Sequence, residues 1–358
     1  MSELAKFNIE AQTSNTSTDG WDELINEPFN SPANSGEVEK SGGITLYDAD
    51  LNIVESTERK ERIADTLQKE IDFISTNFGV DRDFLQKRVD NLAAVEWKVR
   101  TPHKVQYMGE VKTVNGGRNA AAFFAKKSQT YKDGHWDFEN AVYFDDRVSP
   151  HTLDHKLLHA LSANTEINFG ESDIGWDKGG LNVSGYNRQD EKVDDTMFAE
   201  GLNEGVTELL AAKFDGATPD VYLPQVYVAD LLISPNNPKL VQAYFAEDKE
   251  VFRGFLDDFD ARQKSIQSSR LTGLSKSAII DIDDDLLRGC VEYTISHCET
   301  VEQLTAERQR LLPIFNKIIS HNEFGDNYGD EQKQATIDML NQTLLLRRNE
   351  LLKDSQGQ

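Results

Sequence analysis

The sequence contains very little cysteine, with only Cys290 and Cys298 among its 358 residues. The two lie in a stretch whose pattern predicts one helix, and they are too far apart along it to form a disulfide. A framework of disulfides, such as small secreted domains use, is therefore excluded. We expect two reduced thiols in the core, which is typical of a protein in a reducing compartment.

Long hydrophobic runs are missing as well. No window approaches about 18 consecutive apolar residues, so we expect neither a membrane span nor a membrane partner. The first residues, MSELAKFNIEAQ, lack a basic stretch followed by an apolar one, so we expect no secretory signal. Together these absences predict a cytoplasmic or otherwise intracellular protein.

Positive charge is scarce, because 38 lysines and arginines face 62 aspartates and glutamates and give a formal net charge of −24. Such a surface repels phosphate, and no basic run opposes it, so we expect no nucleic-acid partner. The hydrophobic fraction of 38% is low but sufficient for a core. A chain of 358 residues is long enough for one large domain or two ordinary ones.

The N-terminal residues 1–43 are rich in Ser, Thr, Asn, Glu, Gly and Pro and show little periodicity. This composition is typical of a disordered or partner-docking arm. The segment 21–25 (WDELI) is an apolar island in it, and we interpret it either as a short docking segment or as an incidental cluster.

The next part of the chain, 44–148, combines helical and strand patterns. Ile63, Leu67, Ile71 and Ile74 recur at helical spacing, which predicts a helix from about residue 56, with a second helix at 82–93. Alternating and apolar stretches then predict a small sheet. The expected strands are 95–99, 104–108, 121–125 and 140–144.

The segment 149–214 is expected to hold two helices and a loop. Ser149 as N-cap and Pro150 at the first helical position predict a helix that runs to about residue 162. The polar, Gly-rich residues 164–193 predict a long loop, and a second helix is expected at 195–214. The remaining part, 215–358, is predicted to be helical. Its expected helices are 221–233, 237–247, 250–265, 278–298, 300–322 and 330–353.

Two histidines on the first of these helices form one half of a candidate metal site. The spacing of His155 and His159 places both imidazoles on one face of a helix. With Glu204 on the second helix, they make the two-histidine, one-glutamate ligand set of catalytic zinc. The histidine spacing is weak evidence by itself, because the chain has seven histidines and His151 forms a second such pair with His155.

The second helix carries Glu200, Glu204 and Glu208 at intervals of four residues. Like charges at this spacing destabilise a helix by a few tenths of a kcal/mol per pair, and a bound cation would relieve the repulsion. Gly201 and Gly205 each cost about 1 kcal/mol relative to alanine. We expect them to let the histidine helix approach closely. The alternative is an acidic, solvated helix with tolerated glycines.

These residues carry a resemblance to a known family. A strand, an HxxxH helix, a long loop and a helix with 203–208 (NEGVTE) occur in the order found in the gluzincin group of zinc metallopeptidases. The resemblance covers about one fifth of the chain and implies an α+β, zincin-like fold with a small sheet, active-site helices and a mostly helical C-terminal half. It implies that His155, His159 and Glu204 bind Zn²⁺, and that Glu208 orients a ligand histidine.

The resemblance also bears on substrate binding. In the family an edge strand binds the substrate backbone by strand addition, and 140–144 would be that strand. The alternative is an ordinary strand within the sheet. The partner implied by the resemblance is a peptide or protein, as substrate or as binding partner.

Lys156 departs from the family pattern, which has the general-base glutamate at this position. A lysine is a cation at neutral pH, and losing a general base typically lowers the rate by about 10² to 10⁴. Three interpretations stay open: a pseudoenzyme, a substitution in an otherwise active peptidase, or a base supplied by another group. For the last, Glu200 is a better candidate than Asp154, which points away around the helix.

An oxyanion would need a donor near the metal, and Tyr186 and His297 are the candidates for that role. The alternative for each is a structural or exposed side chain. The acidic run 281–285 lacks the glycine and final glutamate of a calcium loop and fits a solvated helix start. The sequence therefore predicts a zinc metallopeptidase-like protein, catalytically impaired by Lys156. The alternative is a non-catalytic binding or structural protein on the same scaffold.

Overall fold

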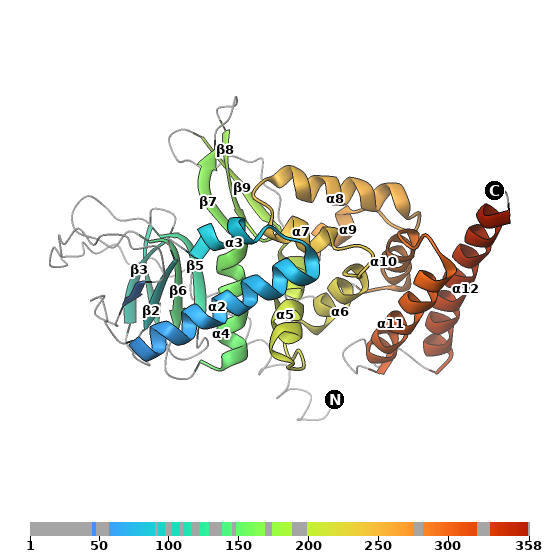
Figure 1. The fold of residues 1–358 in the computed structure, drawn as a ribbon, viewed down its shortest axis with the longest axis horizontal. Coiled ribbons are helices and arrows are strands. Elements are labelled where there is room, and N and C mark those ends of the chain that lie inside the picture. Colours follow the sequence, from blue (N-terminus) through green and yellow to red (C-terminus); the bar gives the residue numbers. More distant parts are fainter. Residues whose placement is uncertain are drawn as a thin grey trace, which may run out of the picture. The chain divides into compact units, whose positions relative to one another are not determined.

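The computed structural model describes twelve stretches of the chain. They are residues 45–47, 57–89, 92–96, 102–107, 110–115, 122–128, 138–144, 148–168, 174–187, 199–274, 282–320 and 330–356. The chain divides into two compact units, Met1–Asn168 and Phe169–Gln358, and the division falls inside the segment 149–214. Helices and strands occur in both units, so the chain is an α+β protein (Figure 1). The arm 1–43 and the segment 21–25 lie outside the described residues.

Among its described residues, the first unit has three helices: α2 (Thr57–Phe78), α3 (Arg82–Val89) and α4 (Pro150–Ser162). The apolar residues Ile63, Leu67, Ile71 and Ile74 on α2 are all buried, as their spacing predicted. Gly79, with φ 68°, follows the last residue of α2, and Asp81 accepts a hydrogen bond from the Phe84 backbone at the start of α3. The two predicted helices of residues 56–93 are therefore confirmed, with α3 ending earlier than expected.

The main sheet of the first unit has the strand order β1-β2-β6-β5. Its strands are β1 (Thr45–Tyr47), β2 (Leu92–Glu96), β6 (Phe138–Phe144) and β5 (Ala122–Ser128). β1, β2 and β6 run parallel, and β5 is antiparallel to β6 at the edge of the sheet. A separate hairpin pairs β3 (Pro102–Tyr107) with β4 (Glu110–Asn115), and β7 (Ala163–Asn168) ends the unit. The predicted strands are present, with β2 displaced toward the N-terminus and β4 unforeseen.

The position of β6 overturns one expectation. β6 is hydrogen-bonded to β2 on one side and to β5 on the other, with Val142 paired to both Ala94 and Phe124. A strand whose two edges are both paired has no free ladder for an added peptide. The proposal that 140–144 binds substrate by strand addition is therefore wrong.

Helix α4 begins and ends as its sequence predicts. The Ser149 hydroxyl accepts a hydrogen bond from the Thr152 backbone at 3.0 Å, and Pro150 occupies the first turn. Leu157, Leu158 and Leu161 are buried, and α4 packs against β5 and β6 of its own unit. This packing fixes the histidine helix to the sheet.

The second unit opens with a hairpin that the sequence did not predict. β8 (Ile174–Gly179) and β9 (Asn182–Asn187) are antiparallel and are joined by the two residues 180–181. Gly180 has φ 58°, a conformation that glycine adopts without a side-chain clash. The prediction of a loop over 164–193 is therefore wrong for β7, β8 and β9, because polar and glycine residues in these strands concealed their pattern.

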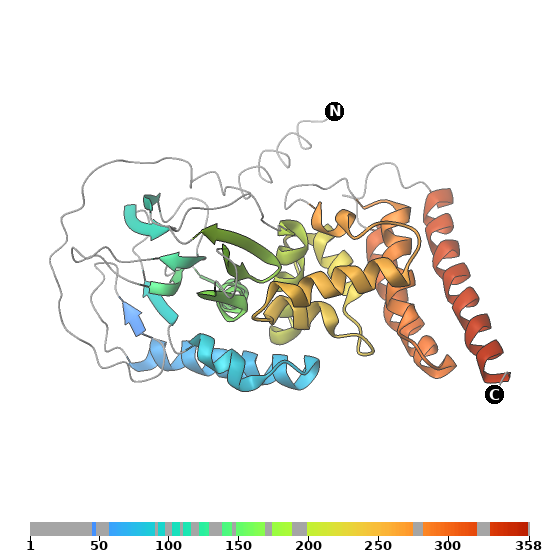
Figure 2. The same cartoon turned by 90° about the horizontal axis from the view of Figure 1, so that it is seen from above.

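The described residues from 199 onward are mainly helical, as predicted (Figure 1). Its helices are α5 (Glu200–Asp215), α6 (Leu223–Leu232), α7 (Lys239–Phe245), α8 (Lys249–Arg262), α9 (Ser269–Thr272), α10 (Asp284–Ser296), α11 (Val301–Ser320) and α12 (Asp330–Gln356). α5 packs on α6, and α12 lies beside α10 and α11 (Figure 2). Asp283 caps α10 through the Leu286 backbone at 2.8 Å, so the acidic run contributes a helix start, as expected.

Cys290 and Cys298 are free and buried in the second unit, which confirms the expectation of two unpaired core thiols. Burial raises the pKa of Cys298 to about 11, and the nearby Glu307 carboxylate acts in the same direction. Among the described residues, no helix is long and apolar enough to cross a membrane.

Candidate functional site

The histidine half of the candidate site lies on α4 in the first unit. The imidazole rings of His155 and His159 have their centroids 5.0 Å apart and stand edge to face. Their nearest ligand nitrogens lie within 4.8 Å of one another. His155 is buried and His159 is partly buried. Two imidazoles held this close on a packed helix can bind one cation through neutral nitrogens.

The carboxylate half lies on α5 in the second unit. Glu200 is exposed in the first turn, whereas Glu204 and Glu208 are 6% and 1% exposed. Two of the three glutamates are therefore buried. The alternative of an acidic, solvated helix is wrong, because these two side chains are almost fully out of contact with solvent. A carboxylate oxygen of Glu208 lies within 4.8 Å of one from the exposed Asp220, a neighbour that the sequence did not suggest.

Asn203 is fixed by the hairpin that precedes α5. Its side-chain oxygen accepts a hydrogen bond from the Leu181 backbone at 2.8 Å, and the residue is 3% exposed. A Cβ added to Gly180 would overlap that oxygen, so only glycine fits this turn. The first residue of NEGVTE therefore fixes α5 to the hairpin.

Thr207 extends the same anchored face one turn further along α5. Its hydroxyl lies 2.7 Å from the Tyr244 hydroxyl and also donates to the Asn203 carbonyl at 2.8 Å. The buried Lys178 ammonium donates to the Tyr244 carbonyl at 2.9 Å, which joins β8 to α7. Because Asn203 and Thr207 fix one face of α5, the glutamates one residue further on have a fixed direction as well.

The glycines of α5 serve a different contact from the one expected. A Cβ on Gly205 would overlap the backbone carbonyl of Gln225, so the close neighbour is α6 of the same unit. The Gly201 backbone donates to the Leu274 carbonyl at 3.0 Å. The interpretation that Gly205 admits the histidine helix is therefore wrong, because α6 occupies the space beside it.

Lys156 lies between the two histidines on α4 and is half-buried. Asp154, on the other side of His155, is buried at 6% exposure and faces Glu70 of α2 closely enough for its charge to act there. This direction agrees with the expectation that Asp154 points away from the histidines. Burial raises the pKa of Glu70 well above its usual range, and Asp154 raises it further.

Glu70 is the buried acid that sequence reasoning missed. It is 0% exposed, and among the described residues neither of its carboxylate oxygens has a hydrogen-bond partner. Its signal in the sequence was its spacing, because Glu70 lies three residues after Leu67 and seven after Ile63 and so shares the apolar face of α2. Glutamate is almost never fully buried unless it is paired, so the residue type argued for the solvent side against this spacing.

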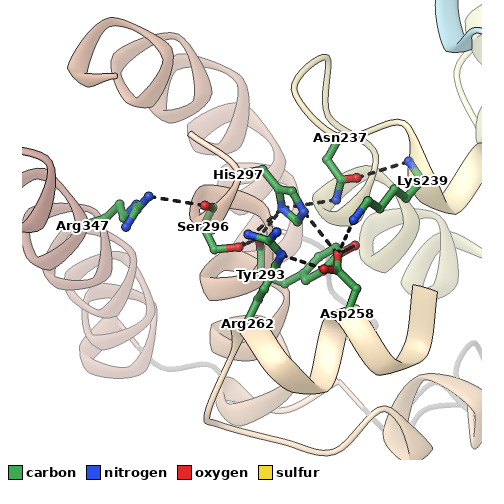
Figure 3. A network of polar contacts seen from close by, with 8 residues as sticks. All are labelled: Asn237, Lys239, Asp258, Arg262, Tyr293, Ser296, His297 and Arg347. Atoms are coloured by element: carbon green, nitrogen blue, oxygen red, sulfur yellow. Dashed lines mark hydrogen bonds and ion pairs between the residues drawn. The ribbon is translucent and has the colours of Figure 1, made fainter. Parts of the chain in front are cut away.

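The oxyanion candidates lie in the second unit. Tyr186 is in β9, and its side chain lies outside the described residues. His297 ends α10, with Nδ1 3.0 Å from the Tyr293 carbonyl and Nε2 3.3 Å from an Asp258 carboxylate oxygen (Figure 3). Burial lowers the pKa of His297, which favours the neutral ring. His297 is thus engaged in the packing of α10, and we do not place it at the candidate site.

Asp258 is the centre of the network in Figure 3. Its carboxylate accepts hydrogen bonds from Arg262 at 2.7 Å, Lys239 at 2.9 Å and Tyr293 at 3.1 Å. Burial opposes the charged form, but the hydrogen bonds and charges of Arg262 and Lys239 prevail and hold the pKa of Asp258 far below its usual range. This network joins α7, α8 and α10 and is a structural feature of the unit.

Comparison with known proteins adds no relative. No family model, no curated protein and no solved structure matches this chain. The resemblance to zinc metallopeptidases therefore depends on the residues of α4 and α5 alone.

Proposed function

We propose that this chain is a zinc-binding, zincin-like protein of the metallopeptidase type, in which Lys156 impairs the catalytic step. His155 and His159 would supply imidazole nitrogens and Glu204 a carboxylate oxygen, and each of these residues offers one ligand atom. This donor set is the one that catalytic zinc takes, with two histidines and a glutamate.

The observation that carries the proposal is that each helix holds its proposed ligand side chains in a fixed position. α4 holds two imidazoles 5.0 Å apart on a helix packed against its sheet. α5 buries Glu204 within a segment whose asparagine and threonine are both hydrogen-bonded into the second unit. A buried carboxylate needs charged or hydrogen-bonding neighbours, and a divalent metal is one neighbour that suits it.

Zinc, when bound, would act as a Lewis acid on a peptide carbonyl and would acidify water. Lys156 of this chain cannot take up a proton at neutral pH in its ordinary, charged state, so the chain lacks the base at the position where the family has it. The expected activity is about 10² to 10⁴ lower than with a glutamate there. Glu200 remains the candidate for a substitute base, since it is exposed and one turn before Glu204.

The metal content of the full chain tests this proposal. We expect about one zinc per chain by plasma mass spectrometry after equilibration with zinc and removal of excess metal. His155→Ala and Glu204→Gln should each abolish retention. Glu250→Gln is the matched control, because Glu250 is an exposed carboxylate of α8 that the proposed ligand set does not include.

A chain that retains no zinc would contradict the proposal and would favour a non-catalytic binding protein. Loss of zinc in His151→Ala, with retention in His159→Ala, would instead assign the metal to the earlier histidine pair. The same samples should be checked by circular dichroism, so that a variant that fails to fold is not counted as a loss of ligand.

A further inference from the structure

The outer face of α12 carries most of the large apolar side chains that are exposed among the described residues. Of five such side chains, three lie on this helix: Leu345 (53%), Leu346 (66%) and Leu352 (36%). The other two, Val221 and Val251, lie elsewhere in the second unit. Leu345 and Leu346 are adjacent and are the most exposed of the five. Clustered exposed leucines of this kind are typical of an interaction site.

The opposite face of α12 packs within the helix's own unit. Met339, Leu340 and Leu344 are buried where α12 packs on α10 and α11. Arg347 also reaches α10 and donates to the Ser296 carbonyl at 3.4 Å (Figure 3). This packing holds α12 in place, and Leu345 lies outside it.

The charges on either side of the two leucines differ in sign. Asp338 precedes the leucines and Lys353 follows them, and both are exposed. Asp338 also accepts a hydrogen bond from the Gln334 side chain at 2.9 Å, one turn earlier on the same helix. Asp354 comes about two and a half turns after Leu345, so it points to the other side of the helix. The outer face is therefore acidic toward the start of α12 and basic toward its end.

Two further charges lie on the flanks of this face and offset each other. Arg348 and Glu350 are both exposed, and they are two residues apart and opposite in sign. Glu350 also accepts a hydrogen bond from Arg347 at 3.0 Å. The separation of the Asp338 charge from the Lys353 charge therefore remains the main electrostatic feature of the outer face.

The outer face is arranged symmetrically about the midpoint between Leu345 and Leu346. Three pairs of exposed residues lie equally far from this midpoint on its two sides: Leu345 with Leu346, Gln342 with Asn349, and Asp338 with Lys353. Because a helix is regular, a half-turn rotation about the outward direction at this midpoint exchanges the two positions of each pair. The exchanged groups suit each other, since leucine meets leucine, amide meets amide and acid meets base. The face is therefore complementary to a rotated copy of itself.

Charge selects the orientation of such a copy. In an antiparallel pair of α12 helices, Asp338 of each copy lies near Lys353 of the other, so opposite charges meet at both ends of the contact. In a parallel pair, Asp338 would meet Asp338 and Lys353 would meet Lys353, which is unfavourable. The face thus fits an antiparallel second copy and opposes a parallel one.

We propose that two copies of this chain associate through the outer faces of α12, antiparallel and related by a two-fold axis between Leu345 and Leu346. The association covers leucines that are otherwise open to water. Because the apolar part of the face is short, the contact belongs at the low end of specific interfaces, about 1,200 Å² or less in total. We expect a dissociation constant on the order of 1 to 100 μM. The contact is independent of whether the chain binds zinc.

Sedimentation velocity of the full chain, measured from about 1 to 500 μM, tests the association. We expect the 40.4 kDa monomer at the lowest concentrations and a dimer at the highest. Leu345→Ser and Leu346→Ser should each raise the dissociation constant about tenfold or more. Val251→Ser is the matched control, because Val251 is 45% exposed on α8 and its replacement should leave the dissociation constant unchanged. Circular dichroism should show that each variant keeps its helices.

A charge exchange tests the antiparallel orientation. Asp338→Lys alone and Lys353→Asp alone should each weaken the dimer, because each brings like charges together at both ends of the contact. The chain that carries both replacements should dimerise about as well as the unaltered chain, since the opposite charges meet again. A parallel pair would not be restored in this way, because its like charges would still face each other.

Three results would overturn the proposal. One is a monomer at every concentration, and if Leu346→Ser also abolished binding to anionic vesicles, the face would belong to a membrane surface. Another is a dimer that both Leu345→Ser and Leu346→Ser leave intact, which would place the association on a different surface. The third is a dimer that the single charge replacements weaken and the double replacement does not restore, which would exclude the antiparallel pairing.

Discussion

The side-chain oxygen of Asn203 accepts a hydrogen bond from the Leu181 backbone at 2.8 Å, and this contact joins the NEGVTE helix to the turn of a hairpin. The turn can approach so closely only because residue 180 has no Cβ. Glu204 follows Asn203 directly, so the direction of this proposed ligand depends on a contact made by its neighbour.

Replacement of Gly180 tests how much this contact contributes to stability. Gly180→Ala should lower the free energy of unfolding both by forcing a positive φ, worth about 1–2 kcal/mol, and by the overlap with Asn203. Gly216→Ala is the matched control, since Gly216 has φ 76° but nothing within 4 Å of an added Cβ. Chemical denaturation should show a clearly larger loss for Gly180→Ala. Equal losses would mean that the Asn203 contact contributes nothing beyond the backbone.

On the proposed function, Lys156 is the residue that impairs catalysis. If the other parts of a peptidase site are intact, Lys156→Glu should raise hydrolysis of a fluorogenic peptide mixture by about 10² to 10⁴ in the zinc-loaded protein. Lys156→Gln removes the same charge without supplying a base and should give no such gain. Equal rates in the two variants, with zinc retained in both, would favour the non-catalytic binding protein.

Glu70 should make the chain less stable as the pH rises. Burial, and then the Asp154 charge, raise the pKa of the folded carboxyl, so between the unfolded and folded pKa values the folded state holds one more proton. The contribution of Glu70 to stability is therefore complete below about pH 4.3 and is lost as the pH rises, at up to about 1.4 kcal/mol per pH unit.

Urea unfolding at pH 5 and pH 8 measures this dependence. Glu70→Gln should flatten it, whereas Glu61→Gln, an exposed change on the same helix, should keep the dependence of the unaltered chain. The same slope in all three proteins would show that Glu70 ionises normally in the folded state.

Local chemistry determined much of this fold in advance. The apolar spacing of α2, the Ser149-Pro150 start of α4 and the helices of the C-terminal part follow from periodicity and capping, which operate within one or two turns. The i, i+4 histidines of α4 and the glutamate stripe of α5 belong to the same class, because a helix converts sequence spacing directly into a shared face.

Contacts between distant segments decided the rest. The hairpin β8–β9 is polar and glycine-rich, and it exists because Asn203 and Tyr244, further along the chain, satisfy and cover it. β6 became an inner strand only when β2 and β5 paired with its two edges. Glu70 shares the apolar face of α2 by its spacing, but only the tertiary structure brings that face to α4 and to Asp154. Sequence spacing fixes which side chains share a face, whereas burial and strand pairing depend on what that face meets.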